Sequence, residues 1–160
     1  MRIVRFVVAM LFLLLLLSPI SAITNGDLDE DGHPCVGAIL VDLDDDLFPP
    51  ADGWPDYWLL CSGTLIDWDD RDDVFLTAAH CTAALDAYIA WGYCTADDIY
   101  VCFEENCYDD PTTYIPVSEY YSHPDYTGKR PLNYDVGVCV LNTVGQDMPT
   151  PAMLADEGYL

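Results

Sequence analysis

The sequence predicts an all-β fold, an antiparallel β-barrel of six to seven strands. After residue 22 no long helical periodicity is present, and short apolar or alternating runs rich in Val, Ile, Leu and Tyr recur instead. Clusters of Asp, Pro, Gly and Asn separate these runs, as is typical of a barrel or a sandwich, and a barrel also closes the sheet edges that an open sheet exposes. The expected strands are 36–43, 58–66, 74–79, 87–93, 99–103, 114–120 and 136–141.

The first 22 residues have the layout of a secretory signal peptide. Arg2 and Arg5 form a basic start, residues 6–17 are an unbroken apolar run, and small residues with a proline follow up to Ala22. A membrane anchor is the alternative, but a spanning helix needs about 20 apolar residues, so a cleaved signal is favoured. We therefore expect a signal peptide over 1–22, a secreted barrel over 23–147 and the start of a linker over 148–160.

The chain is strongly acidic, with 28 Asp and Glu against 5 Lys and Arg and a net charge of −23. Such a surface repels phosphate backbones and anionic lipid headgroups. We therefore expect no nucleic-acid partner, and no membrane partner after signal cleavage. A solvated acidic surface is favoured over an acidic recognition surface.

Seven cysteines follow the signal segment, and in an exported chain they are expected to form disulfides. Seven is an odd number, so at least one thiol has no partner within the chain. Zinc is disfavoured because no C-x-x-C pair is present. The residues themselves leave the pairing open among Cys35, Cys61, Cys81, Cys94, Cys102, Cys107 and Cys139.

Two segments around the third cysteine carry the most specific signal. They are CSGTLI at 61–66 and VFLTAAHC at 74–81. A histidine beside a cysteine is by itself compatible with a structural role or with metal binding. Together, however, the two segments resemble the catalytic-histidine region of the chymotrypsin/trypsin-like serine proteases. This resemblance implies that Cys61 pairs with Cys81, that His80 is the general base, and that the barrel is the first of the two barrels of that fold.

A second region extends the resemblance, with YSHPDY at 121–126 and NYDVGVCVL at 133–141. An aspartate at a strand start is usually a turn residue, but Asp135 matches the triad aspartate of the family. Its implied role is to accept a hydrogen bond from His80, fix the tautomer of the ring and stabilise the imidazolium. The segment ITNG at 23–26 resembles the mature N-terminus of the family. Signal cleavage after Ala22 would free the Ile23 amine for the ion pair that forms beside the nucleophile.

The third member of the triad is missing from the sequence. The family order is His, then Asp, then Ser, yet no serine follows Ser122. We therefore expect a fragment of a secreted trypsin-like serine endopeptidase that lacks its second barrel, needs no cofactor, acts on protein or peptide substrates and is inactive alone. A prematurely stopped gene is a further possible origin. The alternative function is a catalytically inactive, secreted single-barrel binding or decoy module.

An acidic motif at 27–32 and two histidines beside prolines are weaker signals than the segments that carry this resemblance. Residues 27–32 match the first half of a D-x-D-x-D-G calcium loop, but the twelfth position is Ala38, where a bidentate Glu is needed. An acidic surface turn is favoured, and no metal site is expected. His33 and His123 stand beside prolines and are expected to be solvent-facing loop residues.

Overall fold

The computed structural model describes residues 32–44, 47, 57–69, 71–108, 110–131 and 133–154. The expected signal peptide, the expected mature start at Ile23 and the acidic loop at 27–31 lie outside these residues.

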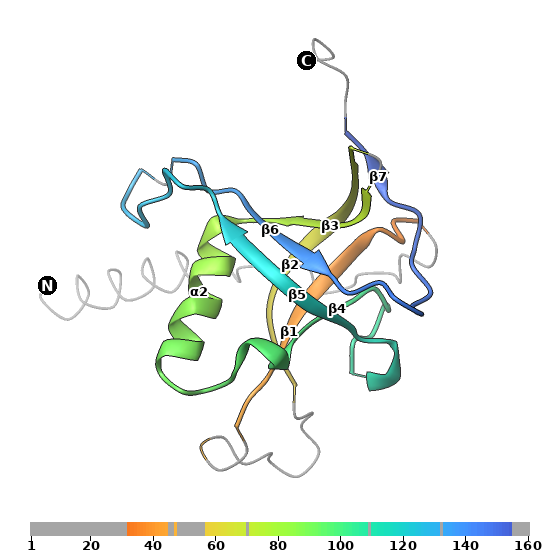
Figure 1. Ribbon diagram of the computed structural model, residues 1–160, viewed down its shortest axis with the longest axis horizontal. Helices are drawn as coiled ribbons and strands as arrows, with labels where there is room; N and C mark the ends of the chain where they lie inside the picture. The colour runs from red at the N-terminus through yellow and green to blue at the C-terminus, as the bar shows by residue number, and fades with distance from the viewer. Residues whose placement is uncertain are drawn as a thin grey trace, which may run out of the picture.

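Six antiparallel strands form a closed barrel (Figure 1). Around it the hydrogen-bonded order is β1-β4-β5-β6-β3-β2, and pairing of β2 with β1 closes the ring. The predicted fold class is thereby confirmed. The strands are β1 (Val36–Asp42), β2 (Tyr57–Trp68), β3 (Arg71–Thr77), β4 (Ile99–Cys102), β5 (Ile115–Ser122) and β6 (Gly137–Leu141).

The barrel interior is filled by alternate side chains of these strands. In β6, for example, residues 137, 139 and 141 are buried while the two between them are only partly covered, as the two-residue period of a strand requires. Ile39, Leu65 and Phe75 are completely buried at the centre of the cluster. Each side chain of this size contributes about 1.5–3 kcal/mol when it is fully removed from water.

Gly63 marks the closest approach between β2 and its neighbour β3. A Cβ at this position would lie 2.4 Å from the carbonyl oxygen of Leu76 and 2.4 Å from the ring of Phe75. Since real side chains do not approach so closely, only glycine lets β2 cover the Phe75 ring. Close packing of β2 on β3 therefore explains the glycine of the CSGTLI motif.

The acidic stretch after Ile66 forms the hairpin between β2 and β3. The connection is short because β2 continues to Trp68 and β3 starts at Arg71. Arg71 pairs with Asp73 on the exposed surface, with N···O distances of 2.8 and 2.7 Å. A seventh strand, β7 (Ala152–Met153), pairs in parallel with β2. It lies within the segment that the sequence analysis expects to start the linker.

One expected strand, 87–93, was wrong, because its first part belongs to the helix α2 (Ala79–Ala90). The expected strand at 74–79 also ends earlier, at Thr77. The helix sequence AHCTAALDAYIA is apolar on most sides, so it lacks the amphipathic period by which a surface helix is recognised. Its five alanines have the highest helix propensity, and the helix packs beside the barrel against β5 and β6 (Figure 1).

Among the described residues, no helix has both the length and the apolar character needed to cross a bilayer.

Candidate active site

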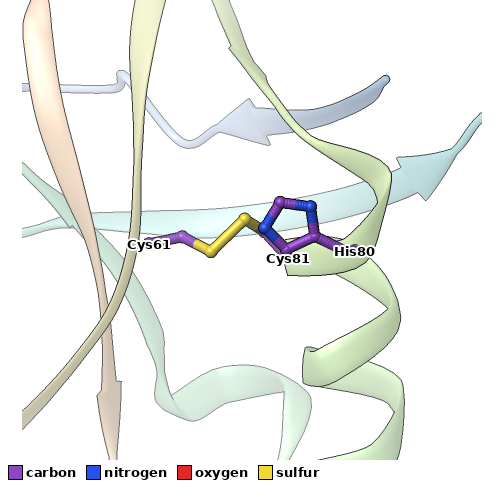
Figure 2. Close-up of side chains that lie close together, drawn as sticks. All are labelled: Cys61, His80 and Cys81. Carbon is purple, nitrogen blue, oxygen red and sulfur yellow. A yellow bond between two sulfur atoms is a disulfide. The ribbon is translucent and has the colours of Figure 1, made fainter. Parts of the chain in front are cut away.

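His80 is the second residue of α2, directly after the turn that leaves β3. The neighbouring Cys81 is buried and forms a disulfide with Cys61 on β2, so the first turn of the helix is covalently fixed to the barrel wall. Figure 2 shows this disulfide beside the His80 ring. The His80 side chain is 56% exposed. The structure therefore holds the backbone of His80 firmly while leaving its ring accessible.

Asp135 lies in the turn just before β6 and meets His80 across 55 positions of sequence. Its Oδ2 is 2.8 Å from Nδ1 of the His80 ring, and its Oδ1 accepts the backbone N–H of His80 at 2.8 Å. With both oxygens engaged by one residue, the carboxylate has a fixed orientation. The ring then keeps its proton on Nδ1, so Nε2, on the opposite edge, is the nitrogen able to accept a proton.

Gly137 allows the start of β6, just after Asp135, to contact the start of α2, which carries His80. A Cβ at Gly137 would lie 2.8 Å from the carbonyl oxygen of Ala78 and 2.8 Å from Oγ1 of Thr82. The start of β6 thus packs directly on the start of α2. Thr82 is completely buried, and its hydroxyl hydrogen-bonds to Ser122 Oγ at 2.6 Å and donates to the Ala79 carbonyl at 3.1 Å. Sequence reasoning missed this support, because nothing local to Thr82 or Ser122 distinguishes them.

The contacts from His80 shift the acidity of Asp135. The hydrogen bond from the His80 ring holds the pKa of the Asp135 carboxyl below its usual value, and the backbone N–H of His80 lowers it further. Both hydrogen bonds favour the ionised form of the acid. A carboxylate that stays charged is the form that can stabilise a protonated imidazole at its side.

We expect the His80→Ala substitution to raise the pKa of Asp135 toward 3.8, its ordinary value, without reaching it. The ring hydrogen bond is lost, whereas the backbone N–H remains. Because the folded-state pKa lies below the unfolded one, the ionised carboxylate stabilises the fold above the unfolded pKa, and this stability is lost as pH falls through the folded pKa. As pH is lowered, the His80→Ala variant should therefore lose this stabilisation at a higher pH than the wild type does. Carboxyl ¹³C NMR titration measures the pKa directly.

The matched control is His33→Ala, since the side chain of His33 is exposed and far along the chain from the pair. It should leave the Asp135 titration unchanged. An Asp135 pKa that is equal in the wild type and in His80→Ala would show that the ring hydrogen bond is absent in solution.

The described residues contain one group of three metal-ligating side chains: Cys61, His80 and Cys81. Their ligand atoms lie within 4.8 Å of one another. The two sulfurs are bonded to each other, however, and a disulfide supplies no thiolate to a metal. This group therefore fits a fixed histidine and not a metal centre.

The two other histidines form no hydrogen bond with His80 or Asp135 that the structure records. His33 is exposed, and His123 is partly covered because its ring stacks on Tyr134 with the centroids 4.9 Å apart. In the part of the chain that is described, no serine hydroxyl hydrogen-bonds to the His80 ring. Ser118 donates instead to the Val140 carbonyl at 3.0 Å.

Comparison with solved structures shows the same protease-like fold. The VesB protease of Vibrio cholerae superposes with a TM-score of 0.54 at 18% sequence identity, over 85% of this chain. The chain spans 34% of the length of that protein. No protein-family model matches the sequence, and no curated protein matches it significantly. At this identity the likeness extends to the fold alone.

Proposed function

We propose that this chain is the N-terminal barrel of a secreted trypsin-like serine endopeptidase, with His80 as its general base. The observation that carries the proposal is the hydrogen bond of 2.8 Å between His80 Nδ1 and Asp135 Oδ2, combined with an accessible ring. A histidine oriented by a buried or partly buried carboxylate is the arrangement that activates a hydroxyl nucleophile. The side chain of Asp135 is 22% exposed, which leaves it partly shielded from water.

In the proposed reaction, Nε2 of His80 takes the proton of a serine hydroxyl as its oxygen attacks the peptide carbonyl. Asp135 stabilises the imidazolium that forms and keeps the ring in position. His80 then gives the proton to the leaving amine, and the acyl-enzyme is hydrolysed by a water that His80 activates in the same way.

We place the nucleophile in a segment outside the described residues. Ser118 and Ser122 use their hydroxyls in bonds to Val140 and Thr82, within the barrel and its helix. By the family order, the serine would follow Asp135 in the chain, and we place it beyond Leu160 together with the second barrel and the substrate pocket. The Cys61–Cys81 disulfide supports export, because such bonds persist outside the reducing cytosol.

The test is to sequence the gene and its transcript past the Leu160 codon and to express the complete reading frame. We expect a Gly-Asp-Ser-Gly-like turn within about 100 further codons, the remaining length of a two-barrel domain. Its serine should react covalently with a fluorophosphonate probe. Labelling should require folded protein, because the nucleophile gains its reactivity from His80.

A stop codon directly after Leu160 in both gene and message would remove the nucleophile and overturn the enzyme proposal. A complete frame whose serine stays unlabelled, although the protein is folded, would do the same. Either result would favour the secreted binding or decoy module instead. The closed barrel with its filled core is compatible with such a module.

A further inference from the structure

Two thiols lie together at the end of β4, on cysteines that the proposed function does not use. Cys102 is the last residue of β4 and is completely buried, whereas Cys107 lies in the following turn and is half-buried. In the structure both are free thiols. The two side chains pack in the same cluster, together with Leu40 and Tyr114.

Both sulfurs are fixed by the backbone of one residue between them. The Glu104 N–H donates to Cys102 Sγ at 3.4 Å, and the Cys107 thiol donates to the Glu104 carbonyl at 3.6 Å. The hydroxyl of the buried Tyr114 donates to the Cys107 carbonyl, which anchors the far end of the turn. The two sulfurs are also close enough for each to affect the acidity of the other. The turn thus holds the two sulfurs side by side.

The contact between the two sulfurs gives Cys102 a pKa shift opposite in direction to those of Cys94 and Cys139. The contact with Cys107 lowers the pKa of Cys102, and the same contact raises the pKa of Cys107. Burial raises the pKa of Cys94, with a smaller contribution from the charge of Asp98, and burial raises the pKa of Cys139 to about 12. Since the thiolate is the reactive form, Cys102 is the buried cysteine best prepared to attack a neighbouring sulfur.

We propose that Cys102 and Cys107 are an oxidation site that closes to a second intramolecular disulfide when the chain meets a disulfide oxidant such as glutathione disulfide. The half-buried Cys107 reacts first, because the oxidant can reach it and cannot reach the buried Cys102. Its raised pKa leaves little thiolate, so this first exchange is the slow step. The product links the end of β4 to the turn that follows it.

The reaction balances as two thiol–disulfide exchanges. Cys107 loses its proton, and its sulfur attacks glutathione disulfide, which forms a mixed disulfide and releases one glutathione thiolate. Cys102 loses its proton, and its sulfur then attacks Cys107 Sγ and displaces the second glutathione thiolate. The cysteines have lost two electrons and two protons, and the oxidant has gained them as two molecules of glutathione.

The test is a peptide map of the folded protein after incubation with glutathione disulfide, acid quenching, denaturation and alkylation. We expect Cys102 and Cys107 to be unalkylated and joined, with the linked species lighter by two hydrogen atoms than its reduced form. Recovery of both residues as alkylated thiols would overturn the proposal. So would a bond from either residue to Cys35, Cys94 or Cys139.

Single variants test the order of the two steps. In Cys102→Ala, Cys107 should retain a stable mixed disulfide with glutathione, because no second thiol displaces it. In Cys107→Ser, Cys102 should stay unmodified while the protein is folded, because it is buried. The matched control Cys35→Ser should form the bond as the wild type does. Unmodified Cys107 in folded Cys102→Ala would refute the proposed order. If that variant does not fold, the peptide map of the wild type still tests whether the disulfide forms.

Discussion

If the proposed function holds, we expect His80→Ala in the full-length protein to lower kcat by about 10⁶-fold, the loss seen when the histidine of a comparable triad is removed. Without the ring no group near the nucleophile can take its proton, and Asp135 lies on the far side of the ring. The barrel itself should remain intact, because the His80 side chain is exposed and packs against no part of the core. Steady-state hydrolysis of a peptide amide, with circular dichroism as the test of folding, measures both effects.

Asp135→Asn should cost less, about 10⁴-fold in kcat. The amide preserves the shape of the carboxylate but removes its charge, and its NH₂ group favours the wrong tautomer of the His80 ring. The loss should fall on kcat more than on KM, because the ion pair matters most when His80 is protonated in the transition state. The control is His33→Ala, which should retain the wild-type rate.

The losses in kcat caused by the two substitutions should also not be additive. If His80 and Asp135 act as one unit, the double variant is no slower than His80→Ala alone. A double variant slower by the product of the two single losses would show that Asp135 acts independently of His80. The hydrogen bonds that join the two residues would then have only a structural role.

Much of the fold could be predicted from local patterns, because each barrel strand alternates or forms a short apolar run. The exception is α2, where the pattern is uninformative. Its buried residues are Ala79, Cys81, Thr82 and Leu85, and most of the remaining residues are apolar as well. The helix is fixed by alanine propensity and by its packing on β5 and β6, and a tertiary contact of that kind leaves no period in the sequence.

The pairing of strands was likewise beyond the sequence. β1 contacts both β2 and β4, and register shifts interrupt its ladder with β2 after Ile39 and the ladder of β5 with β6 after Val117. Such bulges depend on the closure of the whole barrel, since each one bends a strand so that the strands that close the barrel can pair.

The site was predicted in part. Sequence motifs singled out His80 and Asp135, and the resemblance implied the Cys61–Cys81 pairing that the structure contains. The catalytic role of the pair stays a prediction. The sequence left the pairing of Cys102 and Cys107 open, because their contact depends on hydrogen bonds to the Glu104 backbone.

The other large effect should follow removal of the Cys61–Cys81 disulfide. In the chain-entropy model, a bond that closes a loop of 20 residues contributes about 3 kcal/mol to the free energy of unfolding. We expect Cys61→Ala/Cys81→Ala to lose about this amount, measured by urea unfolding at neutral pH. Because Cys81 is buried, the two alanines also remove packed sulfur atoms and add to the loss.

The disulfide should matter for the site as well as for stability. It fixes the helix turn that carries His80, whereas the hydrogen bonds to Asp135 fix the ring only while that turn is formed. Hydrogen exchange at the backbone N–H of His80 should therefore accelerate in the double variant, while Cys35→Ser, which breaks no bond in the structure, leaves it unchanged. A loss of under about 1 kcal/mol, typical of an ordinary substitution, would mean that packing of α2 on β5 and β6 holds the turn that carries His80 without the disulfide.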